Sequence, residues 1–157
     1  MRLDGMLPLI NPCAAGIDAA DTIHAVAVPP GKADPAVGSF GTMNCDLEKI
    51  VEWLLECGID SVAIESSGVY WKPLFSLLIR KGIEVFIVNA REVKNVSRRK
   101  TDERDAAWQQ KLHSFGLLRS AFLPDDKQEA LRNLVRYRHT LVQHCSRFRN
   151  RMQKSLE

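Results

Sequence analysis

The segment CAAGIDAADTIHAVAV, residues 13–28, decides the fold because it reads as two strands joined by a short turn. Residues 13–19 are small and apolar apart from Asp18, as expected of a buried strand. Residues 22–28 alternate in polarity, as a second strand does. We therefore expect a sheet that opens with a hairpin and carries one acid near the end of its first strand.

The rest of the chain extends this hairpin into an ordered series of elements. The pattern predicts strands at 37–42, 61–65 and 83–88, and helices at 44–57, 71–81, 102–115 and from about 127 onward. Asn44 or Asp46 can cap the first helix and Thr101 the third, while Gly58 and Gly82 end the first two. Three strands followed by alternating helices and strands predict an α/β fold with a mixed five-stranded sheet, of the ribonuclease H-like (RuvC-like) type. That fold serves nucleases, transposases and actin-like kinases, so it does not by itself name a function.

Length and charge narrow the classes of protein. A chain of 157 residues can form one core plus a short appendage, and it has no apolar run long enough to span a membrane and no signal peptide. The four cysteines are scattered, which favours reduced thiols and makes a zinc site improbable. Residues 1–89 carry 6 basic and 11 acidic side chains, whereas residues 90–157 carry 16 and 8. The basic second part suits either a polyanionic partner or a solvated helix face.

The last predicted helix differs in kind from the others. Its apolar residues recur at a spacing of three and four, interrupted by Arg138, and are Leu131, Leu134, Leu141, Cys145, Phe148 and Met152. Such a long helix favours a coiled-coil or hairpin arm. We expect a catalytic domain at 1–123 and the start of this arm at 124–157, in a chain that is a fragment.

Four acids form the candidate site. Asp18 and Glu65 end strands that this topology makes neighbours, and Asp102 and Asp105 share one face at the start of a helix. Converging carboxylates repel one another, and Mg²⁺, which prefers such oxygens, relieves that repulsion and supports phosphodiester chemistry. Each acid also has a structural interpretation, as a helix-start charge or a turn residue.

Four stretches carry a resemblance to a known family: GIDAADTIHAVAV, AIESSGVYWKPL, VNAREVKNVSRRKTDERDA and the tail LRNLVRYRHTLVQHCSRFRNRMQKSLE. Together they resemble the N-terminal domain of the DEDD-type insertion-sequence transposases of the IS-one-hundred-and-ten family, also called bridge-RNA-guided recombinases. The likeness runs from about Ala15 to Glu157, and E-S-[ST]-G-V-Y-W combined with K-T-D-x-x-D-A is its specific part.

The resemblance implies a RuvC-like catalytic domain of a DNA transposase. It implies that Asp18, Glu65, Asp102 and Asp105 are catalytic and bind Mg²⁺, for which Mn²⁺ would substitute. It also implies DNA and a noncoding bridge RNA as partners, a homodimer or higher oligomer through the last helix, a prokaryotic cytoplasmic location at the nucleoid, and a downstream serine domain that is absent here. Where the family usually has a lysine, this chain has Asp21, either a fifth acid or a hairpin residue.

Several residues are candidates for nucleic-acid binding. Tyr70 either stacks on bases or packs in the core, whereas Trp71 and Trp108 are expected to pack. The basic candidates are Lys94, Arg98, Arg99, Lys100, Arg104, Arg136, Arg147 and Arg151, which suit phosphate contacts or a solvated surface. Two other functions stay open: a RuvC-like nuclease or junction resolvase, and a non-catalytic RNA-binding and dimerisation module. An actin-like kinase fits least, because the first hairpin lacks the glycine that would approach ATP phosphates.

Overall fold

A computed structural model describes residues 8–66, 68–89 and 102–156, with the side chains of residues 102–104 and 126 left out. Its elements are β1 (Ala14–Ala19), β2 (His24–Ala27), β3 (Val37–Phe40), α1 (Asn44–Glu56), β4 (Ser61–Glu65), α2 (Trp71–Arg80), β5 (Glu84–Val88), α4 (Asp102–Ser114) and α5 (Asp126–Leu156). Each strand and helix expected from the sequence has a counterpart, with ends that differ by a few residues.

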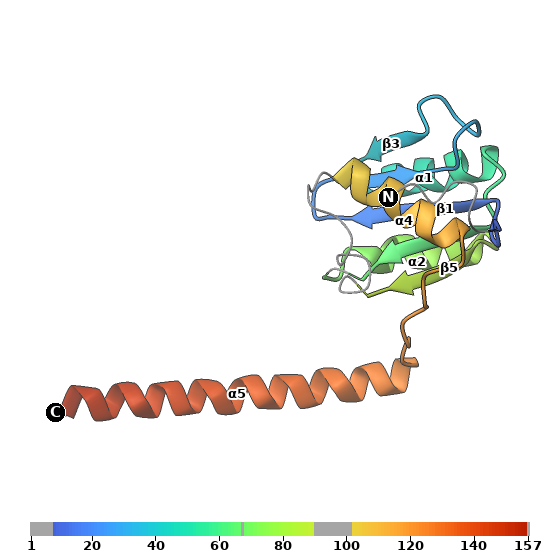
Figure 1. The fold of residues 1–157 in the computed structure, drawn as a ribbon. Helices are drawn as coiled ribbons and strands as arrows, with labels where there is room; N and C mark the ends of the chain where they lie inside the picture. Colours follow the sequence, from blue (N-terminus) through green and yellow to red (C-terminus); the bar gives the residue numbers. More distant parts are fainter. Residues whose placement is uncertain (1–7, 67, 90–101, 157) are drawn as a thin grey trace. The chain divides into compact units, whose positions relative to one another are not determined.

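The five strands form one mixed sheet in the order β3-β2-β1-β4-β5. β1 pairs antiparallel with β2 and parallel with β4, while β2 and β3 are antiparallel and β4 and β5 are parallel. β1, β3, β4 and β5 therefore all point toward the same edge of the sheet, as their arrowheads show (Figure 1). We call this the carboxyl edge.

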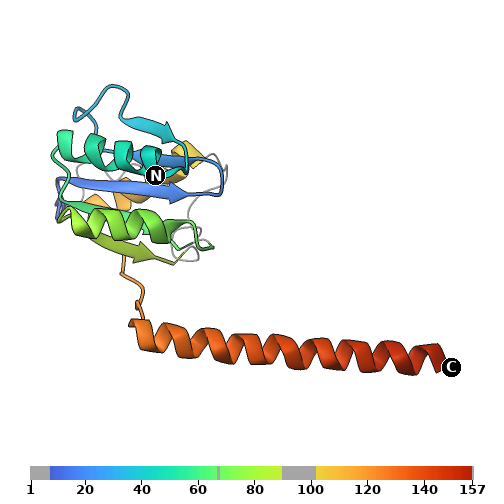
Figure 2. The same ribbon diagram turned by 180° about the vertical axis from the view of Figure 1, so that it is seen from behind.

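Helices cover both faces of the sheet. α1 and α2 lie over one face, seen in front in Figure 2, and α4 lies over the other, seen in front in Figure 1. The main core lies on the α1/α2 face and includes Ile17, Val26, Ile50, Ile64 and Leu74, all inaccessible to solvent. These residues alternate along the strands with those that face α4, as the pleat of a sheet requires.

α4 approaches the sheet unusually closely. A Cβ atom on Gly16 would collide with the backbone of Ala106 and Gln110, so only glycine fits at this point of β1. Alanines make the neighbouring contact between β2 and α4, through Ala25, Ala27 and Ala106. Because Gln110 lies beside Ala14 and Ala106 beside Gly16, α4 runs antiparallel to β1 and begins at the carboxyl edge.

The end of α1 follows the sequence prediction, but its start does not. Gly58 adopts φ 63° just after the helix, and the amides of Gly58 and Ile59 donate to the last turn of α1. At the start, Met43 is the N-cap and no side chain caps the helix, so the prediction that Asn44 or Asp46 caps it is wrong. The Asp46 carboxylate instead forms an ion pair with Lys49 at 2.8 Å.

The chain divides into two compact units, residues 1–121 and 122–157. The second unit consists mainly of α5, a helix of 31 residues. The large apolar residues of its predicted seam are exposed, from 46% for Leu141 to 68% for Met152. A partner for this seam stays a prediction.

Some predictions lie outside the described residues. They concern the basic connector at 91–100, which holds Lys94, Arg98, Arg99 and Lys100, the cap at Thr101, and the side chains of Asp102 and Arg104. Among the helices that the structure describes, none combines the length and the hydropathy needed to cross a membrane.

Candidate functional site

Asp18 and Glu65 lie side by side at the carboxyl edge. Ile17 of β1 pairs with Ile64 of the parallel strand β4, and the two acids are the next residue in each strand. Gly16 and Ala63, two residues earlier, both face α4. Because side chains alternate along a strand, Asp18 and Glu65 face α4 as well.

α4 brings the other two acids to the same place. Gln109 on this helix donates from Nε2 to Oε2 of Glu65 at 3.4 Å, so its face of the helix looks onto β4. Asp105 lies four residues before Gln109, and Asp102 lies three residues before Asp105. Residues at this spacing share one helix face. Both acids therefore lie on the face of Gln109, one and two turns nearer the carboxyl edge.

The acids differ in exposure. Glu65 is only 5% exposed, whereas Asp18 and Asp105 are partly exposed. Among the side chains that the structure describes, which exclude that of Asp102, no three His, Cys, Asp or Glu residues are gathered closely enough to hold a metal ion. Carboxylate oxygens on two strands and a helix are nevertheless the donors that Mg²⁺ prefers, so the chemistry of the set fits that ion.

The predicted nucleic-acid contacts are partly described. Tyr70 precedes α2 at the carboxyl edge and is 46% exposed, which leaves its ring available for stacking. Arg136, Arg147 and Arg151 are exposed on α5. Trp71 and Trp108 pack against core residues, as expected. Asp21 lies exposed in the turn between β1 and β2.

Three buried polar residues escaped the sequence analysis. Gln109 is fully buried, and its place four residues after Asp105 was the available signal. His24 and His113 are also buried, at 2% and 1% exposure. Burial lowers the pKa of both rings, that of His113 to about 4, although the Asp60 carboxylate acts in the opposite direction on His113.

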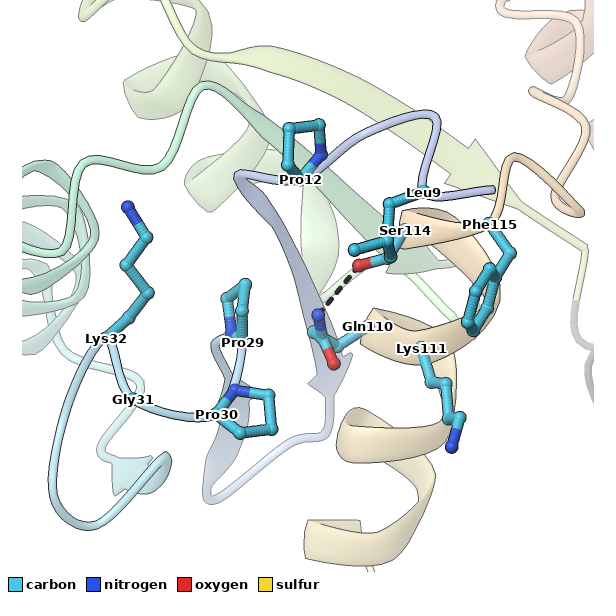
Figure 3. A pocket seen from close by; sticks show the side chains of 10 residues that line it. All are labelled: Leu9, Pro12, Pro29, Pro30, Gly31, Lys32, Gln110, Lys111, Ser114 and Phe115. Atoms are coloured by element: carbon cyan, nitrogen blue, oxygen red, sulfur yellow. Dashed lines mark hydrogen bonds between the residues drawn. The ribbon is translucent and has the colours of Figure 1, made fainter. Parts of the chain in front are cut away.

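A cavity of about 650 Å³ lies away from the acids. Its walls include Pro29 and Pro30, which follow β2, together with Gln110 and Phe115 near the end of α4 (Figure 3). These segments belong to the edge of the sheet opposite the carboxyl edge, so this cavity is not part of the acidic site.

The sheet order and the acids at its carboxyl edge define a class. The chain is a RuvC-like, ribonuclease H-like α/β domain followed by a long helix. The structure of Thermus-type "T. thermophilus RuvC in complex with Holliday junction substrate" is similar with a TM-score of 0.50 at 14% identity, covering 69% of this chain and 98% of that one. At this identity the likeness shows the fold alone.

The particular family follows from the sequence. The model of the DEDD transposases of the IS-one-hundred-and-ten type, described as "Transposase", matches residues 15–157. The chain belongs to this transposase family. No curated protein matches it.

Proposed function

We propose that this chain is the metal-dependent catalytic domain of an RNA-guided DNA recombinase. In this proposal Asp18, Glu65, Asp102 and Asp105 hold Mg²⁺, which Mn²⁺ can replace, and the domain acts on DNA phosphodiesters. Family membership supports transposition as the overall activity. The metal, the four-acid site and the guide RNA are the further steps.

The observation that carries the proposal is the pairing of Ile17 with Ile64. It sets Asp18 and Glu65 next to each other on rigid parallel strands, where two adjacent carboxylates repel each other unless a cation lies between them. α4 adds Asp105 on the facing side, and the close contact at Gly16 keeps that helix near the strands.

The residues divide the chemistry among them. When bound, Mg²⁺ would stabilise charge on the attacking and leaving oxygens of a phosphodiester. Asp18 and Glu65 would orient the ion from the sheet, and Asp102 and Asp105 would complete its shell from α4. Tyr70, exposed at the same edge, would stack on a base and orient the strand.

DNA and RNA are the proposed partners. The similar RuvC structure is bound to a Holliday junction, which supports a branched DNA substrate for the same fold. α5 carries 8 basic and 2 acidic residues, so Arg136, Arg147 and Arg151 suit the backbone of a bridge-type RNA. The exposed seam of α5 would join copies of the chain.

A second function, that of a junction resolvase that cuts by water attack, is favoured by the likeness to RuvC. The acids would be the same in both functions. Hydrolytic cleavage of junction DNA without transfer of the cut strand would favour the resolvase. Retained RNA binding after all four acids are neutralised, with no metal uptake, would instead favour a binding module.

The test is a Mn²⁺ titration by calorimetry, with and without a structured RNA, on the unchanged chain, on Asp105→Asn and on Asp60→Asn. Asp60 is an exposed acid that precedes β4 at the opposite edge, which makes it a matched control. We expect uptake of about two ions, weakened by Asp105→Asn and unchanged by Asp60→Asn. Absence of uptake in every condition would contradict a competent site in this chain.

A further inference from the structure

Two neighbouring glutamines on α4 are buried in different surroundings. Gln110 donates from Nε2 to the Ala14 carbonyl at 3.2 Å and to Ser114 Oγ at 2.8 Å, which fastens α4 to the start of β1 (Figure 3). Gln109 donates only a long hydrogen bond of 3.4 Å, to Glu65 Oε2, among those that its amide makes to described residues.

The amide oxygen of Gln109 gives the second observation. Gln109 is 0% exposed, and within the described part of the chain its Oε1 has no hydrogen-bond partner. A buried polar atom without a partner lowers stability, so an apolar side chain of the same size would suit the packing better. The fold alone therefore gives no reason for an amide here, whereas the contact with Glu65 does.

The contact has a specific effect on Glu65. A carboxylate can turn about its last side-chain bond, and a donor on Oε2 restricts that rotation and determines how the two oxygens are presented. Groups that hold a metal ligand in this way raise the affinity of a site without touching the ion. The position of Gln109, one turn behind Asp105 on the same helix face, lets one helix supply both a ligand and its support.

We infer that Gln109 is a positioning residue that orients the Glu65 carboxylate for a divalent cation. This inference rests on the proposed function, because it takes Glu65 as a metal ligand. It adds that the site includes a neutral amide behind the four acids and that this amide contributes more to metal affinity than to the stability of the fold.

The test compares two substitutions of nearly equal volume on adjacent residues, Gln109→Met and Gln110→Met. Mn²⁺ affinity is measured by calorimetry on the whole chain, and the midpoint of urea unfolding is measured in EDTA. For Gln109→Met we expect an affinity about 10-fold lower or weaker still, with a midpoint at or near that of the unchanged chain. For Gln110→Met we expect the reverse, a lower midpoint with the affinity retained.

The outcomes separate the two claims. Equal Mn²⁺ affinity in Gln109→Met and the unchanged chain would overturn the role of Gln109 and leave the proposed function standing. An equal loss of affinity in both variants would also overturn it, because the effect would then come from a general loosening of α4. No uptake by the unchanged chain would overturn the proposed function and this inference with it.

Discussion

Gly16 is the residue on which the distance between α4 and the sheet depends. We expect Gly16→Ala to destabilise the chain by about 2 kcal/mol or more, because the added methyl group meets the backbone of Ala106 and Gln110, which cannot move aside as a side chain can. Urea unfolding measures this loss. The control is Gly38→Ala, whose methyl group meets the Phe40 ring instead. An equal, small cost at both sites would contradict the close contact.

His113 makes stability depend on pH. Its folded pKa of about 4 lies below the ordinary 6.5, so the unfolded chain binds the proton more readily between these values. Stability is therefore complete above about pH 6.5 and falls as the pH drops toward 4, by roughly 3 kcal/mol from this ring. His24, whose pKa is also lowered, acts in the same direction.

We expect His113→Phe to flatten this pH dependence, because phenylalanine keeps the aromatic contact with Phe86, whose ring lies 4.6 Å from that of His113, and has no proton to bind. The measurement is the urea midpoint at several values between pH 4 and 7.5. An unchanged slope in the variant would contradict the assignment to His113.

At the scale of the element, α5 presents an apolar seam without a partner in its own unit. We expect Leu134→Asp with Leu141→Asp to convert an oligomer of this chain into a monomer, because a carboxylate cannot be buried between helices without a counter-charge. Sedimentation velocity measures the change. Asn133→Asp with Thr140→Asp adds the same charge one position away, outside the seam, and is expected to leave the mass unchanged. Equal behaviour of the two double variants would show that the seam does not join copies.

The elements themselves could be predicted because their patterns are local. The apolar run of residues 61–65 gave β4 with its observed ends, and glycine at 58 and 82 gave two helix ends. The start of α1 could not be predicted in this way, because Asp46 had two partners available and Lys49, three residues on, is the one it meets.

The site was predictable only in part, since it depends on contacts between distant residues. The strand order follows from the sequence pattern and places Asp18 beside Glu65. The burial of Gln109 does not, because nothing local distinguishes it from Gln110, and its contact with Glu65 spans 44 residues. The roles of the four acids stay predictions that the metal titration tests.

At the scale of the whole molecule, the uneven charge predicts salt-dependent RNA binding. We expect Arg147→Gln with Arg151→Gln to weaken binding and to lower the slope of log affinity against log salt by about 1 to 2, because each lost phosphate contact releases fewer counterions. Fluorescence anisotropy with a structured RNA measures both. The control, Arg80→Gln with Lys81→Gln at the end of α2, removes the same charge elsewhere. An effect of equal size in the control would mean that net charge alone governs binding.

The position of α4 also has a consequence for synthesis of the protein. The hydrogen bond from Gln110 to Ala14 joins residues 96 positions apart, so a strand made first waits for a helix made last. Until that helix has left the ribosome, β1 has no cover on one face and Asp18 has no facing acids. The nascent chain therefore gains its complete acidic edge only when the first unit closes, and an unfinished chain is harmless to the chromosome beside which it is translated.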